Sequence, residues 1–211
     1  MDLNSLSDIA NYIVSNGKGI LAADESNPTC KKRFDTIQVD CTEESRRNYR
    51  NMLFSADGMK DNIGGVILFD ETIRQESIDG KPLTEIILMN GALPGIKVDK
   101  GLLPFNNSEV ETITQGLDGL HERCHEYERM GAKFTKWRAV INIGKDMPTQ
   151  ECIDANMEAL AKYAKIAQEN KMVPIVEPEI LINGNHSIDD CFNATSRSIK
   201  ALFDYLDSYD V

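Results

Sequence analysis

Five short apolar segments recur along the chain, and longer segments with polar positions separate them. The five apolar segments are Gly19–Asp24, Gly64–Asp70, Ala92–Asp99, Ala132–Ile143 and Met172–Glu179. Segments that are apolar on both faces are typical of parallel strands covered on each side, and their alternation with helices is typical of βα units. The pattern therefore predicts an α/β protein with a parallel sheet.

The segments between these predicted strands have the features of helices. The predicted helices are Leu3–Val14, Thr42–Ala56, Leu83–Met89, Gln115–Met130, Cys152–Asn170 and Ile188–Tyr209. In Cys152–Asn170 the apolar residues recur at three- and four-residue steps, which is the spacing of an amphipathic helix. Asn27 and Pro28 follow the first predicted strand and are interpreted as breakers.

The fourth predicted strand, Ala132–Ile143, carries two cations in an apolar setting. Alternation along a strand puts Lys136 and Arg138 on one face together with Phe134, and puts Trp137 on the other face. In a central strand both cations point into protein, which is costly unless anions or substrate charges meet them. The alternative is an edge strand whose cations are solvated.

Charged residues lie at or near the C-terminal ends of several predicted strands. They are Asp24, Lys97, Lys136, Arg138, Glu177 and Glu179. An open doubly wound sheet and a (β/α)8 TIM barrel both fit the order of elements, but barrel enzymes place their chemistry at this rim. No G-x-G-x-x-G or G-x-x-x-x-G-K-[ST] motif follows the first strand, which disfavours a nucleotide-binding open sheet. We therefore expect a (β/α)8 barrel.

The residue types at this rim suit the chemistry of phosphorylated sugars. Lysine and arginine provide positive charge for phosphate groups or a developing oxyanion, and the three carboxylates are candidates for proton transfer. Lysines held close together lower each other's pKa, so that a neutral amine can attack a carbonyl. The alternative is that these charges form structural ion pairs at strand ends.

One short motif points to a different chemistry. His121-Glu-Arg-Cys-His125 matches H-E-x-x-H, the signature of zinc proteases. The apolar face of the predicted helix is formed by Leu117, Leu120, Cys124 and Tyr127, so that we expect both histidines to face solvent. Zinc binding at this position is therefore disfavoured, and no metal is expected.

Charge and cysteine content restrict the partners and the compartment. A formal net charge of -11 argues against nucleic acid or an anionic membrane surface as a general partner. No basic n-region opens the chain, and no stretch approaches the roughly 20 apolar residues of a membrane span. The five cysteines form no C-x-x-C pair, and we interpret them as reduced thiols of a cytoplasmic protein.

Six segments of the chain resemble one enzyme family in their order and spacing. They are Gly17–Ser26 (GKGILAADES), Gly64–Phe69 (GGVILF), Gly95–Gly101 (GIKVDKG), Gln115–Leu120 (QGLDGL), Lys136–Arg138 (KWR) and Val176–Leu181 (VEPEIL). These segments resemble class I fructose-1,6-bisphosphate aldolase.

The resemblance implies a fold, a reaction and a set of partners. The fold is a (β/α)8 barrel, of which residues 1–211 cover about the first five βα units as a single domain. The reaction is cleavage of fructose 1,6-bisphosphate to dihydroxyacetone phosphate and glyceraldehyde 3-phosphate through a lysine Schiff base, without metal or cofactor. The partners are the phosphosugar, other copies of the chain in a homotetramer, and a cytoskeletal protein.

The resemblance also implies roles for the six rim residues. Asp24 resembles the carboxylate that interacts with the C4 hydroxyl during carbon–carbon cleavage, and Lys97 and Arg138 correspond to positions that hold the substrate phosphate. Lys136 matches the lysine that assists carbinolamine formation. A further match relates Glu177 to the general acid/base and Glu179 to a neighbouring carboxylate of the same site.

The sequence departs from the family at the nucleophile. The Schiff-base lysine of the family lies on the sixth strand in a Leu-Lys-Pro-Asn run, whereas the only Lys-Pro pair here is Lys81-Pro82 in a predicted loop. We expect the chain to be the N-terminal part of a longer aldolase. The alternatives are a truncated, non-catalytic phosphosugar-binding or scaffolding protein, and another Schiff-base barrel lyase such as a transaldolase.

Overall fold

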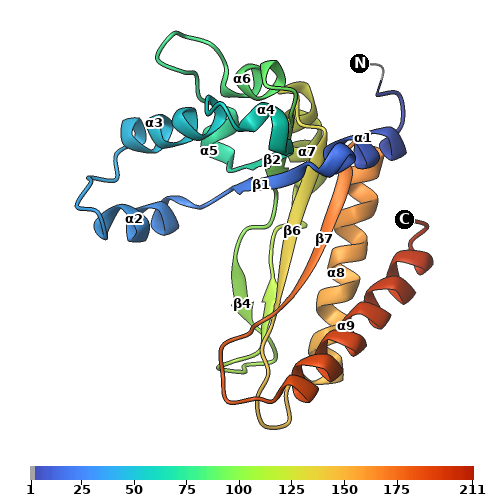
Figure 1. Cartoon of the computed structure of the whole chain (residues 1–211). Helices are drawn as coiled ribbons and strands as arrows, with labels where there is room; N and C mark the ends of the chain where they lie inside the picture. The colour runs from blue at the N-terminus through green and yellow to red at the C-terminus, as the bar shows by residue number, and fades with distance from the viewer. Residues whose placement is uncertain (1–2) are drawn as a thin grey trace. The chain divides into compact units, whose positions relative to one another are not determined.

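The computed structural model describes residues 3–211 (Figure 1). Five strands form one sheet in the order β1-β2-β3-β6-β7, namely β1 (Gly19–Ala23), β2 (Ile63–Leu68), β3 (Leu93–Lys97), β6 (Phe134–Ile141) and β7 (Val173–Ile180). A separate antiparallel pair consists of β4 (Leu102–Pro104) and β5 (Thr112–Thr114). All five predicted strands are therefore present.

Helices connect the strands of the large sheet. They are α1 (Leu6–Ile13), α2 (Asn27–Asp35), α3 (Glu43–Phe54), α4 (Met59–Asn62), α5 (Asp70–Ile73), α6 (Leu83–Met89), α7 (Leu120–Arg129), α8 (Gln150–Glu169) and α9 (Ile188–Ser208), with a 3-10 turn at Ser15–Gly17. β1, β2 and β3 pair in parallel, as βα units require. The predicted α/β class is confirmed.

The strand with the two cations lies inside the sheet. The Lys133 amide donates to the Pro94 carbonyl at 2.8 Å, and the Lys133 carbonyl accepts from the Val173 amide at 3.1 Å. These bonds join the start of β6 to β3 on one side and to β7 on the other. The interpretation of Ala132–Ile143 as an edge strand is therefore wrong.

Contacts group the chain into two compact units, which we describe separately. The first unit comprises Met1–Lys97, His125–Thr135 and Lys171–Val173, and the second comprises Val98–Cys124, Lys136–Asn170 and Pro174–Val211. None of the helices within residues 3–211 combines the length and the apolar character that a membrane crossing requires. The five cysteines are free, as predicted.

In the first unit an aromatic ring covers the sheet where two glycines leave room for it. Phe134 is fully buried, and a Cβ atom added to Gly65 would lie 3.0 Å from its ring. A Cβ atom added to Gly95 on the neighbouring strand would overlap the same ring. The glycines of β2 and β3 thus let the Phe134 side chain lie directly against the sheet backbone.

A buried ion pair links α3 to the residue that follows Asp24. The Arg50 guanidinium lies 2.9 Å from a Glu25 carboxylate oxygen, and the two side chains are only 2% and 7% exposed. Arg50 also donates to the Glu25 carbonyl at 3.0 Å, and Arg33 forms a second ion pair with the Glu25 carboxylate. These contacts hold the chain in place just after β1.

In the second unit, α8 and α9 pack side by side (Figure 1). The side-chain amide of Asn156 on α8 donates to the Thr112 carbonyl at 2.8 Å. The Thr149 amide, at the start of α8, donates to the buried Glu111 carboxylate at 2.7 Å. Both bonds attach the β4–β5 hairpin to α8.

Two predicted boundaries are wrong. Asn27 and Pro28 do not break the chain but open α2, because proline is compatible with the first turn of a helix, where no partner is needed for its nitrogen. The helix predicted over Gln115–Met130 begins only at Leu120. Gly116 and Gly119 have φ of +131° and +62°, and Gln115 exchanges backbone hydrogen bonds with the segment around Gly101.

Substitution of Arg50 by methionine is expected to destabilise the folded protein by about 3–5 kcal/mol, because it leaves the Glu25 carboxylate buried without its main counter-charge. Arg47→Met on the same helix is the matched control, since Arg47 is 31% exposed and lies 3.7 Å from the solvated Glu44. We expect Arg47→Met to lower the free energy of unfolding by less than about 1 kcal/mol. Urea-induced unfolding, followed by circular dichroism, measures the free energy of unfolding of both variants. Equal losses in the two variants would contradict a stabilising role of the buried Glu25–Arg50 ion pair.

Candidate functional site

Two ion pairs connect β6 to β7 in the second unit, where the two strands run side by side (Figure 1). The Lys136 ammonium lies 2.7 Å from a Glu177 carboxylate oxygen. Two residues further along each strand, the Arg138 guanidinium is paired with Glu179. Since side chains at alternate positions share a face, the four residues form two successive charge pairs on one face of the two strands.

The Lys136–Glu177 pair joins a buried cation to a half-exposed carboxylate. Lys136 is 9% exposed as a whole residue, whereas the Glu177 side chain is 42% exposed. An ammonium group with so little solvent needs a counter-charge, and Glu177 provides one. A carboxylate that is ion-paired on one side and open to solvent on the other can exchange a proton with a bound molecule.

Arg138 is fixed through its backbone as well as through its side chain. Its amide donates to an Asp99 carboxylate oxygen at 3.4 Å, and its carbonyl accepts from the Thr114 hydroxyl at 2.9 Å. The guanidinium itself is 40% exposed. A planar guanidinium that is held in place and partly open to solvent can bind a phosphate group in a bidentate manner.

In the first unit, Asp24 and Lys97 lie at the same edge of the parallel sheet. The registers align Ala23 of β1 with Leu68 of β2, and Leu68 with Ile96 of β3. Asp24 and Lys97 each follow directly on these aligned positions, and both are half-buried. With one strand between them, their backbones are about 10 Å apart.

On the opposite face of β6, Trp137 contacts a residue that the sequence did not single out. Its indole ring stacks on Tyr163 of α8 with the ring centroids 5.4 Å apart and the planes at 27°. The alternation that was predicted for Lys136, Trp137 and Arg138 is thereby confirmed. Tyr163 could have been noticed because it falls on the apolar face of its helix, where a phenol needs a hydrogen-bond partner.

The H-E-x-x-H motif lies on the surface of α7. His121 and His125 are both exposed, as predicted. Within residues 3–211, no three histidine, cysteine or acidic side chains are grouped closely enough to hold a metal ion.

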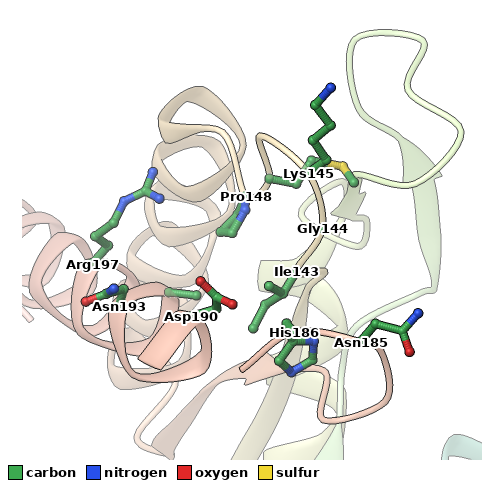
Figure 2. Close-up of a pocket in the computed structure, with 11 residues that line it drawn as sticks. Ile143, Gly144, Lys145, Pro148, Asn185, His186, Asp190, Asn193 and Arg197 are labelled. Carbon is green, nitrogen blue, oxygen red and sulfur yellow. The ribbon is translucent and has the colours of Figure 1, made fainter. Parts of the chain in front are cut away.

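A cavity of about 560 Å³ lies in the second unit, beside the N-terminal ends of α8 and α9 (Figure 2). Its lining includes Lys145, His186, Asp190 and Arg197, and it contains none of the six predicted site residues. Figure 2 shows the Lys145 side chain extending away from Asp190 and His186. The Asp190 carboxylate accepts hydrogen bonds from the Ser187 amide and hydroxyl, which hold the pKa of Asp190 below its usual value.

Known proteins match the chain over almost its whole length. The sequence model of the family described as "Fructose-bisphosphate aldolase class-I" matches residues 5–211. The "Probable fructose-bisphosphate aldolase class 1" of Xanthomonas axonopodis pv. citri (strain 306) is 48% identical over 96% of this chain and 61% of its own length. "Fructose-bisphosphate aldolase 5, cytosolic" of Arabidopsis thaliana is also 48% identical, over 96% of this chain and 56% of its own length.

A solved structure has the same fold. It is the fructose-bisphosphate aldolase of Plasmodium falciparum in a complex with TRAP and a small-molecule inhibitor, and it aligns with a TM-score of 0.93 at 47% identity. The alignment covers 95% of this chain and 58% of that protein, and the described βα units thus form part of a (β/α)8 barrel, as predicted. The chain spans about three fifths of the length of these curated relatives. The identities and the match over residues 5–211 show that the chain belongs to the class I fructose-bisphosphate aldolase family.

Proposed function

We propose that the complete protein cleaves fructose 1,6-bisphosphate to dihydroxyacetone phosphate and glyceraldehyde 3-phosphate through a lysine Schiff base, without a metal or cofactor. Membership of the class I family supports the reaction. The observation that carries the proposal for this chain is the Lys136–Glu177 pair at 2.7 Å, in which a buried ammonium meets a carboxylate open to solvent. We also propose that residues 1–211 belong to one barrel domain.

Proton transfer is the role that we propose for Glu177. Formation and breakdown of a carbinolamine require a proton to be delivered and removed at the same oxygen, and a half-exposed carboxylate within hydrogen-bond reach of an ammonium can do both. Lys136 contributes its positive charge, which stabilises the oxygen as negative charge develops on it. Glu179 is proposed to act in the same site by holding Arg138.

Arg138 and Lys97 are proposed to bind a phosphate group of the substrate, because both are cations that retain some exposure. Lys97 ends β3, as predicted, whereas Arg138 lies within β6 and not at its end. Asp24 is proposed to interact with the C4 hydroxyl, from which a proton must be withdrawn as the carbon–carbon bond breaks. The buried Glu25–Arg50 ion pair next to Asp24 limits its freedom to move.

We further propose a cytoplasmic homotetramer that also binds a cytoskeletal partner. One relative carries the word cytosolic in its name, and a solved relative is in a complex with TRAP. The second candidate function is a non-catalytic phosphosugar-binding or scaffolding protein. It is supported by the partly exposed cations Lys97 and Arg138, which can bind a phosphate group with or without turnover.

The complete protein is expected to cleave fructose 1,6-bisphosphate at an undiminished rate after dialysis against EDTA, because the proposed electrophile is a protonated Schiff base. A coupled assay that oxidises NADH as dihydroxyacetone phosphate is reduced measures the rate. Loss of most activity on dialysis, with recovery on addition of zinc, would contradict the mechanism. Binding of the bisphosphate without turnover would favour the scaffolding protein.

Glu177→Gln in the complete protein is expected to lower kcat by about 10²–10⁴-fold with little change in KM, since a proton shuttle acts in the chemical steps. Lys97→Ala is the comparison variant and is expected mainly to raise KM, because it removes a proposed phosphate contact. Steady-state kinetics separate the two effects. An unchanged kcat with a raised KM in Glu177→Gln would show that the residue only binds substrate.

The 211-residue chain by itself is expected to form no Schiff base with dihydroxyacetone phosphate. Lys136 is the nearest substitute for the missing nucleophile, but its ammonium is paired with Glu177, and a misplacement of about 1 Å can cost on the order of 10²-fold in rate. Borohydride trapping followed by intact-mass analysis is the measurement, and the complete protein is the positive control. A stoichiometric adduct on Lys136 of the 211-residue chain would contradict the expectation.

A further inference from the structure

The Tyr163 side chain on α8 contacts both strands that carry the ion pairs. Its ring stacks on Trp137 of β6, and its hydroxyl donates to the Ile175 carbonyl of β7 at 3.2 Å. Both aromatic side chains have no solvent exposure. All of these residues belong to the second unit.

The contact with β6 determines which way the cations point. Trp137 stands between Lys136 and Arg138, so that a ring held on the α8 face leaves the two cations on the other face. The indole ring of Trp137 is also enclosed on the side of Gly116. A Cβ atom added to Gly116 would lie 3.2 Å from this ring and 3.1 Å from the Val98 carbonyl oxygen. Rotation of the Trp137 side chain is therefore blocked by packing on more than one edge.

The contact with β7 determines the position of the strand that carries the two carboxylates relative to α8. Ile175 precedes Glu177 by two residues, which corresponds to about 6.6 Å along a parallel strand. A hydrogen bond to the Ile175 carbonyl therefore limits sliding of this strand relative to α8. Because the same tyrosine holds Trp137, movement of β7 relative to β6 would have to strain or break one of the two contacts.

We infer that Tyr163 is a positioning residue for the Lys136–Glu177 pair: through Trp137 and the Ile175 carbonyl it fixes the offset between β6 and β7 that places the ammonium 2.7 Å from the carboxylate. The inference rests on the proposed function, because the offset matters to a reaction only if this pair serves it. Tyr163 itself takes no part in proton transfer. Its effect on the rate is indirect, through the distance between the two charged groups.

The test is Tyr163→Phe in the complete protein, since this change keeps the stacked ring and removes only the hydroxyl. We expect kcat to fall about tenfold with KM within twofold of the wild type, because sub-ångström misplacement of a proton-transfer group slows the chemical step. We also expect a shift of the pH profile of kcat, because the variant displaces the two charged groups that the reaction is proposed to use. A purely structural role would lower the melting temperature and leave the pH profile unchanged.

Tyr209→Phe is the matched control. The Tyr209 hydroxyl donates a hydrogen bond to the Glu158 carboxylate of α8 at 2.9 Å. Tyr209→Phe therefore also removes a phenol hydroxyl that takes part in a contact with α8. We expect its kcat, KM and pH profile to equal those of the wild type. A fall in kcat in this variant equal to that of Tyr163→Phe would overturn the inference.

A second variant covers the case in which Tyr163→Phe does not fold. Trp137→Phe keeps the hydrogen bond to β7 and reduces the stack on β6, and it is expected to lower kcat and shift the pH profile in the same directions. Wild-type kcat and an unchanged pH profile in whichever of the two variants folds would overturn the inference. Absence of fructose 1,6-bisphosphate turnover in the wild-type complete protein would instead refute the proposed function, and the inference with it.

Discussion

The buried ammonium of Lys136 is the constraint on which the arrangement of the second unit depends. A cation that is 9% exposed is tolerated only next to a counter-charge, and Glu177 supplies it from the neighbouring strand. This requirement links the register of β6 to that of β7, because a shift of one residue would turn every side chain to the other face. The second charge pair, Arg138 with Glu179, repeats the same alignment two residues further along.

Packing on the opposite face of β6 helps to keep this alignment in place. Aromatic packing of Trp137 against Tyr163 is directional, and it is insulated from solvent by α8. Charged side chains on one face are thus held by hydrophobic packing on the other. In the first unit, Phe134 packs directly against the glycines of β2 and β3.

Exposure separates the proposed chemical roles within the second unit. Lys136 is almost fully covered, which suits a fixed charge, whereas Glu177 and Arg138 keep about two fifths of their side-chain surface open. A proton carrier and a phosphate ligand both need access to a bound molecule, but a group that only stabilises charge does not. The cavity near His186 and Asp190 contains no comparable pair, and its single carboxylate caps α9.

The sequence by itself determined the order of the βα units, the position of each strand within about two residues, and the face on which Lys136 and Arg138 lie. These features follow from local rules, since side-chain alternation and hydrophobic spacing are properties of a single segment. The six family segments added the expected chemistry.

Only the tertiary structure decided which carboxylate meets each cation, since that depends on the register between strands that are distant in sequence. It also decided that the Gln115–Gly119 segment is not part of α7, and that Tyr163 joins β6 to β7. In each of these cases the outcome depends on hydrogen bonds and packing with partners that local sequence does not specify.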